Sequence, residues 1–132
     1  MGLDEWLENG ARILRGIGLE KGQIILDFGC GKGNYSIPAS KVVGETGLEY
    51  SLDKNSWVLD ELKKRARSIG LPNIVIMETS GEVEFDLENS HLDVVLLYDI
   101  FWYFPIYDNK LTKLLDEVNR VLKDGGDTLS IS

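Results

Sequence analysis

The stretch ILDFGCGKGNY, residues 25–35, joins a short apolar run to a loop with three glycines. An apolar run ends at Asp27, and Gly29, Gly31 and Gly33 follow at alternate positions. Glycine accepts positive φ angles and lets ligand atoms lie against the main chain. If a helix begins after this loop, its first N–H groups face the same place. The stretch therefore predicts a strand, a loop that approaches a ligand closely, and a helix.

Short apolar runs alternate with amphipathic segments along the rest of the chain. The apolar runs predict strands at residues 23–27, 48–53, 74–77, 92–98 and from 128 to the end. The amphipathic segments predict helices at residues 3–15, 34–43, 56–69 and 111–122, with Trp57 and Leu115 facing inward and Gly125–Gly126 ending the last helix. This alternation predicts an α/β fold in which helices cover both faces of a parallel sheet of about five strands. We expect residues 1–132 to form one domain.

Composition and charge narrow the class of protein. The 132 residues carry a net charge of -8, which argues against general affinity for nucleic acid or an anionic membrane. The basic cluster KKRARS, residues 63–68, is expected to be a solvated helix face. Cys30 is the one cysteine and fits a reducing compartment, and we expect it to pack in the loop rather than act as a nucleophile. With no pattern of a signal peptide or a bilayer span, the sequence predicts a cytoplasmic protein.

A second acid follows the second predicted strand. Asp53 stands where a carboxylate can accept hydrogen bonds from both hydroxyls of a ribose. The loop spacing is G-x-G-x-G rather than the dinucleotide fingerprint G-x-G-x-x-G. In addition, Asp27 precedes the first glycine so closely that it suits a ligand with an amino group better than a pyrophosphate. These features favour S-adenosylmethionine, and an NAD-dependent oxidoreductase remains an alternative.

Four segments, in order, resemble the class I S-adenosylmethionine-dependent methyltransferases, especially the small-molecule, quinone-biosynthesis type. They are ILDFGCGKGNYS (25–36), LEYSLDKN (48–55), NSHLDVVLLYDIFWYF (89–104) and LLDEVNRVLKDGGDTLSIS (114–132). The resemblance implies a Rossmann-like, doubly wound sheet, S-adenosylmethionine as cofactor and methyl transfer to a small-molecule acceptor. A non-catalytic cofactor-binding module or a truncated fragment is the second alternative.

The family adds an antiparallel hairpin after its fifth strand, and this chain ends within that strand. We therefore expect the C-terminal hairpin to be absent, through truncation or in a naturally short variant. A fifth strand at the edge of the sheet could pair with another copy of the chain, which predicts a homo-oligomer.

The resemblance also implies roles for individual residues. The expected cofactor-binding residues are Asp27, Gly29, Gly31, Gly33, Leu52, Asp53, Lys54, Ser80, Gly81 and Tyr98. Asp53 would hold the ribose hydroxyls, and Leu52 and Lys54 would flank the adenine. Asp99, Tyr98 and Tyr103 are candidates for positioning the acceptor. No separate catalytic motif is expected because the sulfonium is already activated, and no His, Cys and Asp grouping has metal-ligand spacing.

Overall fold

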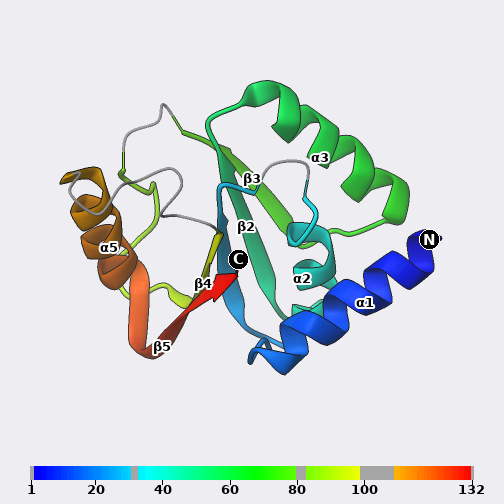
Figure 1. Ribbon diagram of the computed structural model, residues 1–132, viewed down its shortest axis with the longest axis horizontal. Helices are drawn as coiled ribbons and strands as arrows, with labels where there is room; N and C mark the ends of the chain where they lie inside the picture. The colour runs from blue at the N-terminus through cyan, green and yellow to red at the C-terminus, as the bar shows by residue number, and fades with distance from the viewer. Residues whose placement is uncertain (1, 31–32, 80–82, 99–108, 132) are drawn as a thin grey trace.

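The computed structural model describes residues 2–30, 33–79, 83–98 and 109–131. Its elements are, in chain order, α1 (Leu3–Gly16), β1 (Ile24–Phe28), α2 (Ser36–Val43), β2 (Leu48–Asp53), α3 (Ser56–Ile69), β3 (Ile74–Glu78), β4 (Leu92–Tyr98), α5 (Asn109–Val121) and β5 (Leu122–Ile131). The strands form one parallel sheet in the order β3-β2-β1-β4-β5 (Figure 1). Helices α1, α2 and α3 pack on one face and α5 on the other. The predicted fold class is confirmed.

β1 and β4 lie side by side at the middle of the sheet, and both are buried. In β4, Val94 and Leu96 pack with α1 and α2, whereas Val95 and Leu97 pack with α5. Side chains of a strand alternate between the faces, so a strand covered on both sides needs a nearly continuous apolar run. The strand order reverses between β1 and β4, and ligands of such sheets bind beyond the carboxyl ends of the strands at that point. The glycine loop, which follows β1, lies there.

α3 begins and ends as the sequence predicts. The side chain of its N-cap, Asn55, accepts hydrogen bonds from two main-chain N–H groups of the first turn, at 3.0 and 3.3 Å. Gly70 ends the helix in the left-handed conformation, with φ of 81°. The expectation that Trp57 faces inward is wrong, since it is 59% exposed. It precedes the buried Leu59 by two residues, which places it about 200° away around the helix.

The junction between α5 and β5 differs from the prediction. The strand begins at Leu122 rather than residue 128, and the Gly125–Gly126 pair lies inside β5 instead of ending the helix. Pairing with β4 shifts register between Leu92 and Val94. The first glycine of the pair has φ of 81°, a conformation that side chains disfavour. The pair thus permits an irregularity that turns the chain directly from helix into sheet.

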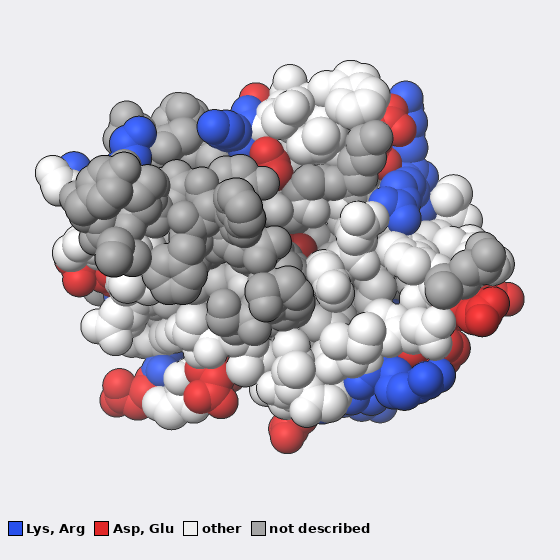
Figure 2. Space-filling model, viewed as in Figure 1, with Lys and Arg blue, Asp and Glu red and all other residues white. Residues whose placement is uncertain are grey.

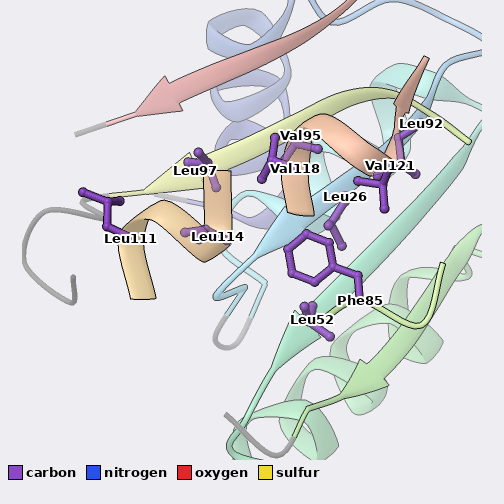
Figure 3. Close-up of a cluster of buried hydrophobic side chains, with 10 residues drawn as sticks. All are labelled: Leu26, Leu52, Phe85, Leu92, Val95, Leu97, Leu111, Leu114, Val118 and Val121. Carbon is purple, nitrogen blue, oxygen red and sulfur yellow. The ribbon is translucent and has the colours of Figure 1, made fainter. Parts of the chain in front are cut away.

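The core between α5 and the sheet contains ten buried side chains (Figure 3). They are Leu26, Leu52, Phe85, Leu92, Val95, Leu97, Leu111, Leu114, Val118 and Val121. Leu115 is 47% exposed, so the expectation that it faces inward is wrong. Phe85 comes from the irregular chain between β3 and β4, and Figure 3 shows its ring close to Leu52. Within the described ranges, no helix is both long and apolar enough to cross a membrane.

Candidate functional site

The carboxyl ends of three neighbouring strands are tied together by main-chain hydrogen bonds. The carbonyl oxygen of Leu52, in β2, accepts from the N–H groups of Gly29 and Cys30 at 2.8 and 3.0 Å. The carbonyl oxygen of Asp53 accepts from the N–H of Thr79, just after β3, at 3.0 Å. The glycine loop, Asp53 and the end of β3 are therefore held together at one edge of the sheet.

The two described glycines of the loop have different surroundings. Gly29 has φ of 72°, and a Cβ placed there would meet no atom of the described residues within 4 Å apart from its two chain neighbours. Gly33 has φ of 89°, and a Cβ there would collide with Cδ1 of Leu62, in α3. Gly33 is thus required by the packing of the loop against α3, whereas the open side of Gly29 leaves room for a ligand.

Asp27 lies below this loop as a fully buried carboxyl group. Its Oδ2 accepts a hydrogen bond of 2.6 Å from the Ser36 hydroxyl, and its Oδ1 has no partner within the described residues. Burial raises the pKa of Asp27 to about 7, against the lowering effect of the Ser36 hydrogen bond. A buried carboxylate oxygen without a partner can accept a hydrogen bond from a donor, either a ligand N–H group or a bound water.

Glu49 is a second fully buried carboxyl group, and the sequence analysis missed it. The Ser51 hydroxyl lies 2.8 and 2.6 Å from its two oxygens. Burial raises the pKa of Glu49, and the charge of Asp27 raises it further. The β1–β2 register pairs Ile25 with Glu49 and Asp27 with Ser51, so both acids lie on the same face of the sheet. The sequence does contain a signal for Glu49, because an acid inside a strand that helices are predicted to cover on both faces must be buried.

Asp53 ends β2 and is partly buried. Its Oδ1 accepts a hydrogen bond of 3.0 Å from the N–H of Asn55, which fixes the carboxylate at the start of α3. Lys54 is exposed beside it. The side chain of Leu52 is 3% exposed and packs in the core under α5, so its contact with the loop is through its carbonyl oxygen.

The remaining predicted site residues fall where the structure gives no side-chain description. Gly31, Ser80, Gly81, Asp99 and Tyr103 lie outside the described residues. Tyr98 is the last residue of β4, and its side chain is likewise not described. Of the predicted cofactor-binding residues, the fold therefore brings Asp27, Gly29, Gly33, Leu52, Asp53 and Lys54 to one end of the sheet.

Asp27 and Asp53 place two carboxyl groups at this end of the sheet, whereas Glu49, the second residue of β2, lies nearer the amino end of its strand. The charge of Asp53 raises the pKa of Asp27, and the charge of Asp27 raises that of Glu49. Such surroundings favour a cationic ligand and disfavour a pyrophosphate. In the described ranges, no group of three or more His, Cys, Asp or Glu side chains is arranged to hold a metal ion.

The sequence of the same region matches a known family. Residues 25–126 match the family described as "Methyltransferase domain", which is more than half of the chain. The chain belongs to this methyltransferase family. The match includes β1 with its glycine loop, β2 with Asp53, and β4.

Curated relatives and solved structures agree with this methyltransferase assignment. Demethylmenaquinone methyltransferase of Staphylococcus aureus (strain MRSA252) is 31% identical over 115 residues, which cover 87% of this chain and 45% of that protein. The chain therefore spans less than half the length of the curated relatives it matches. A SAM-dependent methyltransferase from Aquifex aeolicus superposes with a TM-score of 0.76 at 28% identity, over 87% of this chain and 58% of that one.

A more distant structure shares the fold. Coclaurine N-methyltransferase bound to N-methylheliamine and SAH has a TM-score of 0.76 at 16% identity, over 98% of this chain and 37% of its own. The resemblance to class I S-adenosylmethionine-dependent methyltransferases, including the quinone-biosynthesis type, is confirmed at the level of family and fold.

Proposed function

We propose that this chain binds S-adenosylmethionine and transfers its methyl group to a small-molecule acceptor. The observation that carries the proposal is the unpartnered Oδ1 of Asp27, buried beneath the glycine loop. The open side of Gly29 provides space next to it, and Asp53 stands at the end of the adjacent strand. S-adenosylmethionine matches these surroundings because it carries positive charge and a ribose.

The residues of the chain would bind and orient the two reactants. Bound S-adenosylmethionine supplies an activated methyl group on its sulfonium. Asp53, fixed by the N–H of Asn55, would accept hydrogen bonds from the ribose hydroxyls. Asp27 would accept an N–H directly or through a water. Gly31, Ser80, Gly81 and Tyr98 complete the proposed cofactor site, and Asp99, Tyr98 and Tyr103 are the proposed residues that position the acceptor in line with the methyl group.

The competing ligand is NAD, whose pyrophosphate is an anion. Asp53 and the ionised form of Asp27 would repel it, and the glycine spacing is not that of the dinucleotide fingerprint. We therefore expect S-adenosylhomocysteine to bind and NAD not to bind under the same conditions. Tighter binding of NAD would overturn the assignment.

Calorimetric titration with S-adenosylhomocysteine tests the site. Asp53→Asn keeps an oxygen for the Asn55 N–H but loses the charge offered to the ribose hydroxyls, so binding should weaken. Charge-assisted hydrogen bonds are worth about 1.5–3 kcal/mol, which is about 10- to 100-fold in affinity. Asp60→Asn, at an exposed carboxylate of α3, is the matched control and should leave affinity unchanged. Equal affinities for all three proteins would show that Asp53 does not bind the cofactor.

A methyl-transfer assay with small planar phenols and quinols separates an enzyme from a non-catalytic binding module. Binding without turnover of any acceptor would favour the module. We propose a small-molecule acceptor rather than a nucleic acid because of the net charge of -8. On the face shown in Figure 2, Lys and Arg side chains occur in separate groups with Asp and Glu among them, rather than as one continuous stripe.

Three further proposals concern the state of the chain. We propose that residues 1–132 form one domain, because all described helices pack on a single sheet. We propose a cytoplasmic location, in which the thiol of Cys30 stays reduced, and cell fractionation tests it. We also propose that two copies pair through the outer edge of β5, which has no neighbouring strand within the described residues. Light scattering that finds only monomers would overturn this last proposal.

A further inference from the structure

Two side chains of α5, Glu117 and Arg120, hold the irregular chain between β3 and β4. Nε and Nη2 of Arg120 donate to the two carboxylate oxygens of Glu117 at 2.5 and 2.9 Å. Nη1 and Nη2 also donate to the carbonyl oxygens of Leu87 and Phe85 at 2.8 and 2.9 Å. Glu117 in turn accepts from the main-chain N–H of Phe85 at 2.5 Å. We call Glu117 and Arg120 together the α5 clamp.

The α5 clamp is more buried than the Lys64–Glu61 ion pair on the surface of α3. The Glu117 side chain is 12% exposed and that of Arg120 is 34% exposed, whereas Lys64 of the Lys64–Glu61 pair on α3 is 74% exposed. The guanidinium binds the carboxylate through two parallel hydrogen bonds, and it also donates to the main-chain carbonyls of Phe85 and Leu87 and to Oδ1 of Asn89. This geometry is specific to arginine, since a lysine ammonium cannot reproduce the planar fork.

Phe85 packs beneath the residues that hold the glycine loop. The α5 clamp forms hydrogen bonds with both the main-chain N–H and the carbonyl group of Phe85. Its side chain is 4% exposed, and its ring packs on that of Phe28 with centroids 5.7 Å apart. It shares the core with Leu52, and Figure 3 shows these two side chains together. Phe28 directly precedes Gly29, and the carbonyl of Leu52 binds the N–H groups at the start of the loop. Phe85 therefore packs with Phe28 and Leu52, the two residues that hold the start of the loop.

We propose that the α5 clamp is a positioning device for the cofactor site. By fixing Phe85, it sets the position of Phe28 and Leu52, and through them the glycine loop and the end of β2. Without the clamp, the loop occupies its binding geometry for a smaller fraction of the time, and affinity falls by that fraction. Glu117 and Arg120 act through other residues, so they are positioning residues and not cofactor ligands. The inference rests on the proposed cofactor site at this loop.

Calorimetric titration of the full 132-residue chain with S-adenosylhomocysteine tests the proposal. The variants are Arg120→Lys, which keeps the charge and loses the fork, and Glu117→Gln, which keeps an acceptor and loses the charge. Each should weaken binding about fivefold or more. Lys113→Gln is the matched control, at an exposed position of the same helix, and should bind as the unaltered chain does. Arg120→Gln serves as a stronger third variant, and the two conservative variants suffice if it does not fold.

A purely structural role predicts a different pattern. All titrations are made well below each variant's own unfolding midpoint, where the protein is fully folded. A lower midpoint with unchanged affinity overturns the proposal. Hydrogen exchange provides a second readout, because the amides of Gly29 and Cys30 should exchange faster in Arg120→Lys than in the control. If the unaltered chain does not bind S-adenosylhomocysteine, the proposed function itself fails and this inference with it; binding by the unaltered chain with equal binding by the variants sinks the inference alone.

Discussion

Asp27→Asn should change how the stability of the cofactor-free chain depends on pH. The carboxyl group is fully buried, and burial raises its pKa from 3.8 to about 7. A raised pKa means that the folded state holds the proton more tightly than the unfolded state. The resulting stability is complete below about pH 3.8 and is lost as the pH rises to about 7. Asparagine carries no titrating proton, so the variant should not show this loss.

The expected size follows from the two pKa values of Asp27. A pKa of about 7 in place of 3.8 corresponds to about 4 kcal/mol of unfolding free energy between low and high pH. About 2–3 kcal/mol of this falls between about pH 5 and about pH 8. Glu117, whose pKa is lowered by Arg120 and then by the Phe85 N–H, has the opposite effect, but its contribution is complete above its ordinary value of 4.5. The window above about pH 5 therefore isolates the buried acids.

Urea unfolding at a series of pH values, without cofactor, measures the effect. From about pH 5 to about pH 8, the unfolding free energy of Asp27→Asn should rise by about 2–3 kcal/mol relative to that of the unaltered chain. This difference does not depend on how stable the variant is at the lower pH. Asp60→Asn, at an exposed carboxylate, should run parallel to the unaltered chain. Glu49→Gln should gain in the same direction, and the double variant should gain less than the sum because the two acids interact. Parallel curves for Asp27→Asn and the unaltered chain would refute the reasoning.

Three further predictions concern the same loop. Gly33→Ala should be more destabilising than Gly29→Ala in urea unfolding. Both variants force a side chain into positive φ, which costs about 1–2 kcal/mol, and only the Gly33 variant also collides with Leu62. Equal losses of stability would contradict the packing of Gly33 against α3. Affinity for S-adenosylhomocysteine should rise about tenfold between about pH 6 and about pH 8 as Asp27 ionises, and a flat calorimetric profile would count against its role. Burial raises the pKa of the Cys30 thiol, so it should react with a disulfide reagent at about pH 8 far more slowly in the folded chain than in urea, and equal rates would exclude a buried thiol.

The sheet could be predicted from the sequence because each strand has a local signal. β1 and β4 are nearly all apolar, and the turn at residues 70–73 and the glycine loop mark the boundaries between elements. The start of β5 could not be predicted in this way. A glycine pair after an amphipathic helix normally indicates its end, and here the pair lies within a strand because pairing with β4 outweighs the local preference. Tertiary pairing of this kind leaves no trace in the local pattern.

The site was only partly predictable for a related reason. Asp27 and Asp53 follow or end strands, so topology alone places them together. Whether a glycine faces a ligand or a neighbouring helix depends on packing, and the spacing of Gly29 and Gly33 does not distinguish the two cases. The main-chain partners of Arg120 are more than thirty positions away, at residues 85 and 87, so the local pattern indicates the ion pair with Glu117 but not these contacts.

The two buried acids, Asp27 and Glu49, also bear on why this part of the sheet is built as it is. Asp27 and Glu49 are fully buried, with only hydroxyl partners among the described residues, and they reduce the stability of the folded chain as the pH rises and they ionise, because their charged forms lack solvation. A cationic ligand beside Asp27 would offset that cost, and so part of the binding energy comes from relieving charge repulsion already present in the free protein. A neutral substitution at Asp27 would then increase the stability of the free chain and decrease the stability of the complex with the ligand. This opposition is expected of a group retained for binding and not for folding.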